Sequence, residues 1–210
     1  MRFRWFFLGY LLMFSLPAGS TEITLLPALG YALMLYAALR LCKYETAFNH
    51  AKKILYAAVP IGLAVLGVEI YLTVAGDGAI AAMKTVDTCL SWADELIEMA
   101  VMFFVYIGVR RMGDQTEIPA LTKHSSRNMA VMFVYLLTEV SISMLHTFVP
   151  EVFEGFGLIM LYPFVIGFAW RILNLWMLFT CFLGIADTKE EEQREKLEAE
   201  KEMAKRRNGK

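Results

Sequence analysis

Long apolar runs separated by short polar segments extend over most of the chain. A transmembrane helix needs about 20 mainly apolar residues to cross a hydrocarbon core of roughly 30 Å. The pattern therefore predicts an all-α fold, a polytopic transmembrane bundle of six helices that forms one domain over residues 1–186. The predicted spans lie near residues 4–18, 23–42, 54–75, 88–109, 128–148 and 158–185.

Positively charged residues fall on one set of the connecting segments. Eighteen of the 20 Lys and Arg residues lie before the first span, after the second, between the fourth and fifth, or after the sixth. The opposite segments are mainly acidic and contain Lys84 as their one basic residue. Because cytoplasmic loops are enriched in Lys and Arg, this asymmetry predicts a multi-pass protein of the cell membrane with both termini in the cytoplasm.

The two ends of the chain need separate interpretation. Residues 1–19 fit either a first membrane helix or a cleaved secretory signal, which would leave five spans and the same cytoplasmic C-terminus. Residues 187–210 are strongly charged and contain opposite charges four residues apart, such as Glu190 and Arg194. This spacing predicts a solvated, charged cytoplasmic helix.

Composition and motifs exclude several functional classes. The chain is 58% hydrophobic, above the roughly 45–50% of soluble domains, and it has no compact basic face, so no nucleic-acid partner is expected. Its three cysteines form no C-x-x-C pair, and no metal-ligand spacing, phosphate-binding loop or nucleophile motif occurs. The sequence thus predicts no metal and no cofactor, favours a protein that is not an enzyme, and indicates the lipid bilayer as its main partner.

The segment CLSWADELIEM, residues 89–99, brings carboxylates into the predicted fourth span. At 1.5 Å per residue, Glu98 lies about 18 Å from the basic end of that span, and Glu139 lies at a similar depth in the fifth. Arg171 lies about 20–24 Å into the sixth span. Each charge would cost about 2.5–3.5 kcal/mol against lipid, and an arginine does not release its proton. We therefore expect Arg171 to pair with Glu98, Glu139 or both.

Other polar residues share the faces of these charges at helical spacings. Asp94 and Glu95 lie about one turn farther out than Glu98, beside a tryptophan, which predicts a position at the membrane–water interface. The candidate ligand- or ion-binding residues are Glu98, Glu139, Arg171, Asn174, Ser143, Asp94 and Glu95. Two interpretations stay open, namely ion pairs that fix which helices pack together, or a site for a solute or ion.

The stretch LLPALGYALMLYAALRL, residues 25–41, contains a motif of low specificity. The motif consists of Glu22, Pro27, Gly30 and Tyr31, followed by the basic AKK at 51–53. It resembles the first hairpin of small uncharacterised integral membrane proteins of Gram-positive, spore-forming bacteria. Ala28 departs from that group, in which an acidic residue often follows the proline. The resemblance ends near residue 53 and implies no activity, cofactor or partner.

Two functions are compatible with these patterns. The first is a small accessory or structural membrane component that holds its bundle together with buried charges and binds another membrane protein. The second is solute-binding or ion-coupled transport through the same cluster. Six spans with both termini inside also resemble, by size and topology alone, the substrate-binding subunit of vitamin-type modular importers.

Overall fold

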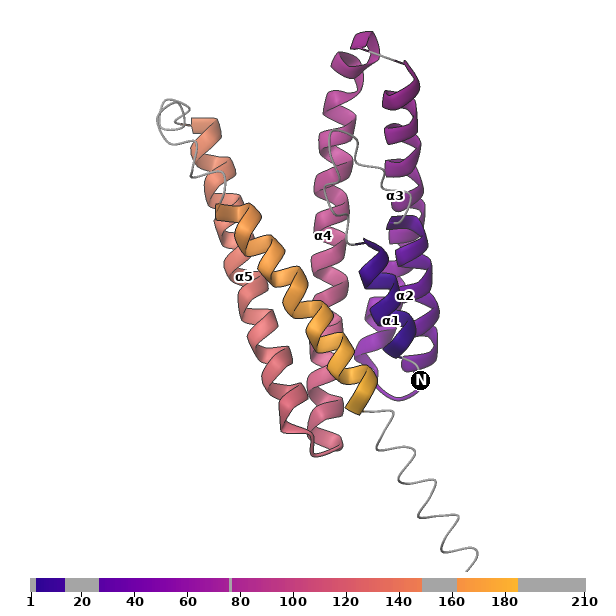
Figure 1. Ribbon diagram of the computed structural model, residues 1–210, viewed down its shortest axis with the longest axis vertical. Helices are drawn as coiled ribbons and strands as arrows, with labels where there is room; N and C mark the ends of the chain where they lie inside the picture. Colours follow the sequence, from indigo (N-terminus) through magenta and orange to yellow (C-terminus); the bar gives the residue numbers. More distant parts are fainter. Residues whose placement is uncertain (1–2, 14–26, 76, 149–161, 185–210) are drawn as a thin grey trace, which may run out of the picture.

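The computed structural model (Figure 1) describes residues 3–13, 27–75, 77–148 and 162–184. These ranges are helical apart from two short connections at 42–46 and 116–118, and they contain no strand. The helices are α1 (Phe3–Met13), α2 (Pro27–Leu41), α3 (Ala47–Ala75), α4 (Asp77–Gln115), α5 (Pro119–Phe148) and a sixth, Tyr162–Gly184, called the last helix below. The predicted all-α class with six helices is confirmed, whereas the charged segment 187–210 lies outside the described residues.

Three of these helices contain stretches long and apolar enough to cross a membrane. They are Ala47–Val68 of α3, Pro119–Leu145 of α5, and Tyr162–Gly184. α4 has 39 residues, but its carboxylates interrupt the apolar run. α1 and α2 have 11 and 15 residues, fewer than the predicted spans, and residues 14–26 between them lie outside the described part. The chain is therefore a membrane protein by this criterion, while the number of crossings and their direction stay predictions.

Three helices begin earlier than the apolar pattern predicted. α3, α4 and α5 begin at Ala47, Asp77 and Pro119, not near residues 54, 88 and 128. Hydropathy marks the part of a helix that crosses the hydrocarbon core, but the backbone hydrogen bonds of a helix continue into polar surroundings. The segments that extend beyond the predicted spans, 47–53, 77–87 and 119–127, each contain charged residues. Pro119 opens α5, where its missing N–H costs nothing.

α1 and α2 cross through two glycines that face each other. A Cβ at Gly9 would lie 2.6 Å from the carbonyl oxygen of Gly30, and a Cβ at Gly30 would lie 2.7 Å from the carbonyl oxygen of Gly9. Small residues allow membrane helices to approach this closely. The close crossing brings Tyr10 of α1 and Tyr31 of α2 into the core, where they are 1% and 0% exposed.

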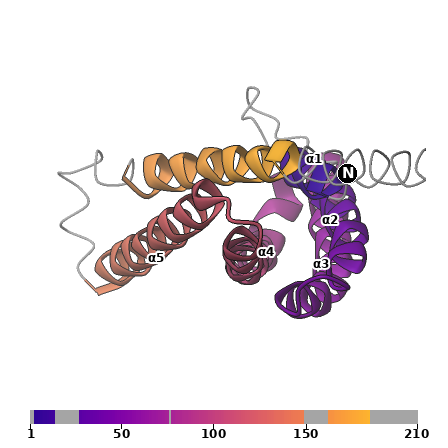
Figure 2. The same cartoon turned by 90° about the horizontal axis from the view of Figure 1, so that it is seen from below.

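α4 is the central element of the bundle. It packs against α3 on one side and α5 on the other, and Figure 2 shows these helices side by side as seen from below. The last helix runs from α5 across α4 to α1, where the Phe179 and Phe7 rings lie 5.7 Å apart. At its other end Gly167 lies against α5, because a Cβ there would meet the Tyr135 ring at 2.9 Å. The polar face of α4 is therefore covered by helices from both ends of the chain.

Candidate functional site

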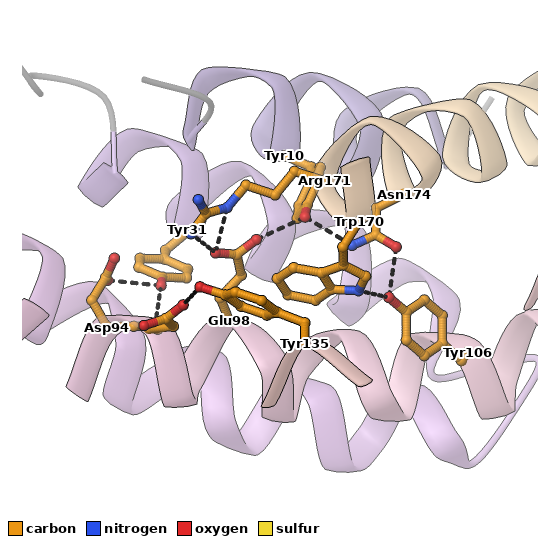
Figure 3. Close-up of polar contacts among 10 residues, drawn as sticks. Tyr10, Tyr31, Asp94, Glu98, Tyr106, Tyr135, Trp170, Arg171 and Asn174 are labelled. Atoms are coloured by element: carbon orange, nitrogen blue, oxygen red, sulfur yellow. Dashed lines mark hydrogen bonds and ion pairs between the residues drawn. The ribbon is translucent and has the colours of Figure 1, made fainter. Parts of the chain in front are cut away.

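The centre of the site is the carboxylate of Glu98 on α4, which is 6% exposed. The Tyr10 hydroxyl of α1 donates a hydrogen bond of 2.7 Å to its Oε1. Arg171 of the last helix donates to Oε2 from Nε and Nη2, at 3.3 and 3.2 Å. Figure 3 shows Tyr10, Glu98 and Arg171 meeting at this point. Both oxygens of the buried carboxylate thus have partners, one neutral and one cationic.

Asn174 continues the network on the last helix, about one turn from Arg171. Its side chain is fully buried, and its Nδ2 donates to the Tyr10 hydroxyl at 2.9 Å. Its Oδ1 accepts from the Tyr106 hydroxyl at 2.6 Å, and Tyr106 in turn accepts from the Trp170 indole N–H at 2.7 Å. Figure 3 shows this as one connected chain from Trp170 to Glu98. In this chain each hydrogen bond is donated in the direction of the Glu98 carboxylate.

α5 joins the network through two polar residues. The amide of Asn128 donates to the Leu173 carbonyl at 2.7 Å and to Asn174 Oδ1 at 3.3 Å. The Ser125 hydroxyl donates to the Tyr106 carbonyl at 2.6 Å. Asn128 and Ser125 are 0% and 1% exposed. Buried polar groups of this kind are tolerated in a membrane bundle because each has a partner on a neighbouring helix.

Asp94 and Glu95 lie farther along α4 and also contact tyrosines. The Tyr31 hydroxyl of α2 donates to Asp94 Oδ1 at 2.8 Å, and the Tyr135 hydroxyl of α5 donates to Glu95 Oε1. Both carboxylates are half-buried. Their position at the membrane–water interface stays a prediction, and both accept hydrogen bonds from hydroxyls inside the bundle. The reason is that tyrosines on two neighbouring helices reach the same level of α4.

Glu139 lies outside the ion-pair network. The two ion pairs found among the described residues are Arg171–Glu98 and Arg111–Glu45, so Arg171 pairs with Glu98 and the alternative with Glu139 is not present. Glu139 is half-buried and close enough to Glu95 for their charges to interact. Ser143, one turn farther along α5, is half-buried as well. On this face of α5 the side chains are therefore more exposed at Glu139 and Ser143 than at Tyr135.

The charges of this region do not balance. Arg171 provides one positive charge, and its side chain is 38% exposed. Around it lie Glu98 in direct contact and Asp94 within electrostatic range. Figure 3 shows the Arg171 side chain reaching the Glu98 carboxylate, with Tyr10 and Tyr31 on either side of it in this view. The outer carboxylates, Asp94 and Glu95, accept hydrogen bonds from tyrosine hydroxyls and belong to neither ion pair of the described residues.

Several residues of the network were missed by sequence reasoning. They are Tyr10, Tyr31, Tyr106, Ser125, Asn128, Tyr135 and Trp170. A helical spacing was available for some of them, because Tyr106 lies two turns from Glu98 on α4 and Tyr135 lies one turn from Glu139 on α5. For Tyr10 and Tyr31 no comparable signal exists, since a tyrosine in an apolar helix is ordinary.

The chemistry available in this network is binding and orientation. In the described part of the chain, no three His, Cys, Asp or Glu side chains are placed to hold a metal ion. Apart from His124 Nδ1, every buried side-chain nitrogen and oxygen of the described residues has a hydrogen-bond partner. Hydroxyls and amides that are fully engaged in this way stabilise one arrangement of helices.

A second ion pair closes the end of the bundle at the α2–α3 connection. Arg111 of α4 donates to Glu45 Oε1 at 2.9 Å, and the Ala47 amide, the first of α3, donates to the same oxygen at 3.3 Å. Burial opposes ionisation of Glu45, but these hydrogen bonds hold the pKa of its carboxyl below the usual range. Glu45 therefore links the start of α3 to the end of α4 as a carboxylate.

Comparison with known proteins yields no relative of this chain. The sequence matches no protein-family model, and no significant match is found among curated proteins or solved structures. The functional interpretation therefore depends on the geometry of the site.

Proposed function

We propose that the protein is a non-enzymatic accessory component of the cell membrane whose Glu98–Arg171 network clamps the helices of one bundle. The observation that carries this proposal is the set of partners of Glu98. Its two oxygens accept hydrogen bonds from Tyr10 and Arg171, which lie 88 and 73 residues away in the chain. Each bond joins a different helix to α4. Removing either partner would leave a buried polar group unpaired, so the network specifies which helices pack together.

The proposal includes a topology with both termini in the cytoplasm. It is supported by the distribution of Lys and Arg, eighteen of 20 of which fall on one set of segments. The α2–α3 and α4–α5 connections and the N-terminal end of α1 lie at the same end of the bundle in Figure 1. Arg40, Lys43, Arg110 and Arg111 border those connections and are exposed. Under the positive-inside rule this end faces the cytoplasm.

Charge neutralisation of the clamp tests the proposal. Glu98→Gln leaves Arg171 without its ionic partner, Arg171→Gln leaves the buried Glu98 carboxylate without its cation, and the double variant leaves two neutral amides. We expect each single change to lower the melting temperature and the amount of folded protein in the membrane, and the double variant to recover part of the loss. Arg110→Gln, an exposed arginine on the same helix as Glu98, is the control. Single variants as stable as wild type would contradict the clamp.

A second candidate, ion-coupled or solute transport, is favoured by one observation. Glu139 lies within the candidate span Pro119–Leu145, is half-buried, and belongs to neither ion pair of the described residues. A carboxylate within a membrane span is protonated, paired with a cation, or hydrated in a water-filled cavity. Liposomes containing the protein and a pH-sensitive dye test this directly. Proton flux that Glu139→Gln abolishes and Ser141→Ala preserves would support transport, and liposomes as tight as protein-free ones would exclude proton-coupled flux.

A further inference from the structure

Two arginines at the same end of α1 and α2 are stacked against aromatic rings. The Arg4 guanidinium carbon lies 5.0 Å from the ring centroid of Trp5, and the Arg40 guanidinium carbon lies 5.1 Å from that of Tyr36. The Trp5 and Tyr36 rings contact each other edge to face, with centroids 5.9 Å apart. The four side chains therefore form one continuous row across the α1–α2 pair, called the Arg4–Arg40 row below.

Stacking orients an arginine without using up its hydrogen-bonding capacity. A cation–π contact engages the face of the guanidinium, while its N–H donors lie in the plane at the edge. Arg40 uses one donor, because its Nη2 bonds to the Tyr36 hydroxyl at 3.0 Å. Both arginines are exposed. Each guanidinium of the row is thus held against a ring, with N–H donors that make no other hydrogen bond found among the described residues, and such planar donors suit phosphate oxygens.

The surroundings of the row are those of a membrane interface. Tyr36 and the neighbouring Leu39 are 42% and 38% exposed, so apolar surface continues from the row along α2. Arg40 lies in the last turn of α2 and Arg4 in the first turn of α1. Tryptophan and tyrosine favour the level of the lipid headgroups, and arginine beside them reaches the phosphates.

We propose that the Arg4–Arg40 row is a binding site for the phosphate of an anionic phospholipid headgroup. This inference rests on the proposed membrane topology, in which this end of the bundle lies at the cytoplasmic leaflet. Anionic lipids concentrate in that leaflet, and basic residues near its surface attract them. The remaining exposed cations of this end, such as Arg110, contribute general attraction. The row differs because its aromatic rings hold the two guanidiniums in place before a lipid arrives.

Native mass spectrometry of the protein released from nanodiscs tests the site. The probes are phosphatidylglycerol, which is anionic, and phosphatidylcholine, which is zwitterionic, each in its own nanodisc and in an equal mixture. We expect the wild type to retain phosphatidylglycerol, and Arg4→Gln or Arg40→Gln to weaken its retention by about fivefold each. Tyr36→Leu keeps every charge but removes the stacking, so it is expected to weaken retention as well. Arg110→Gln removes the same charge outside the row and is the matched control.

Three results would overturn the inference. The first is a loss with Arg110→Gln as large as with Arg40→Gln, which would mean general attraction. The second is equal retention of both lipids by the wild type. The third is displacement of the lipid by millimolar inorganic phosphate, which would mean a site for a free anion. Melting temperatures of all variants separate loss of the site from loss of the fold. Because a nanodisc presents the same lipids on both faces, the result does not depend on which end of the bundle faces the cytoplasm, so failure of the site and failure of the topology are distinguishable.

Discussion

Asn174 allows the energetic role of the network to be measured by one substitution. It is 0% exposed, and its side chain contacts three others, the hydroxyls of Tyr10 and Tyr106 and the amide of Asn128. Asn174→Ala removes these contacts without introducing a charge. Glu98 and Arg171 keep each other in this variant, so the ion pair is not disturbed directly.

The expected loss of folding stability depends on which hydrogen bonds the partners of Asn174 keep in the variant. Tyr106 loses the acceptor of its hydroxyl, and an unsatisfied buried donor costs about 1–3 kcal/mol. Tyr10 still donates to Glu98, and Asn128 still donates to the Leu173 carbonyl. Each of these two therefore loses only one interhelical hydrogen bond, worth about 0.6 kcal/mol on average in a membrane protein. The total expected destabilisation is about 2–4 kcal/mol.

Equilibrium unfolding in mixed detergent micelles, with added sodium dodecyl sulfate as denaturant, measures this difference. Tryptophan fluorescence is a suitable signal, because Trp170 is fully buried and its indole N–H donates to Tyr106. Ser141→Ala changes an exposed polar residue of α5 and is expected to stay within about 0.5 kcal/mol of wild type. An Asn174→Ala variant that also stays within about 0.5 kcal/mol would refute the reasoning, since the network would then contribute no stability.

Two further predictions concern the helix crossing and the second ion pair. Gly9→Ala is expected to destabilise by about 1–3 kcal/mol, because its Cβ would lie 2.6 Å from the Gly30 carbonyl oxygen. Gly67→Ala is the control, because its Cβ would meet nothing within 4 Å, and it should melt at or above the wild-type temperature. A Gly9→Ala variant that melts at the wild-type temperature would contradict the close crossing. Folding lowers the pKa of Glu45. The contribution of Glu45 to folding stability is therefore complete above its unfolded-state pKa of about 4.3, and it is lost as the pH falls through the lower folded-state pKa. The stability difference between wild type and Glu45→Gln should therefore shrink as the pH is lowered below about 4.3. It should stay below about 1 kcal/mol because the Arg111 side chain is 56% exposed. A difference that does not change as the pH is lowered would contradict the ionised pair.

The sequence by itself determined the helical class and the presence of buried charge. Uninterrupted apolar runs leave a chain few alternatives to membrane helices, because backbone groups in lipid must be bonded within the segment. A depth for Glu98 and Arg171 can be predicted by counting residues along a helix of known rise. An arginine at that depth requires a partner, so the existence of a polar cluster was predictable from composition and position.

The tertiary structure decided which residues meet. The sequence predicted Glu98 and Glu139 at similar depth, but Arg171 pairs with Glu98, because the choice depends on how far each helix is rotated and inclined. The tyrosines of α1 and α2 enter the network only because Gly9 and Gly30 let those helices cross closely. Helix ends also differ from the apolar pattern, since a helix continues beyond the membrane while hydropathy does not. Depth is a property of one segment, whereas partnership depends on the relative placement of several, and only the folded bundle contains that information.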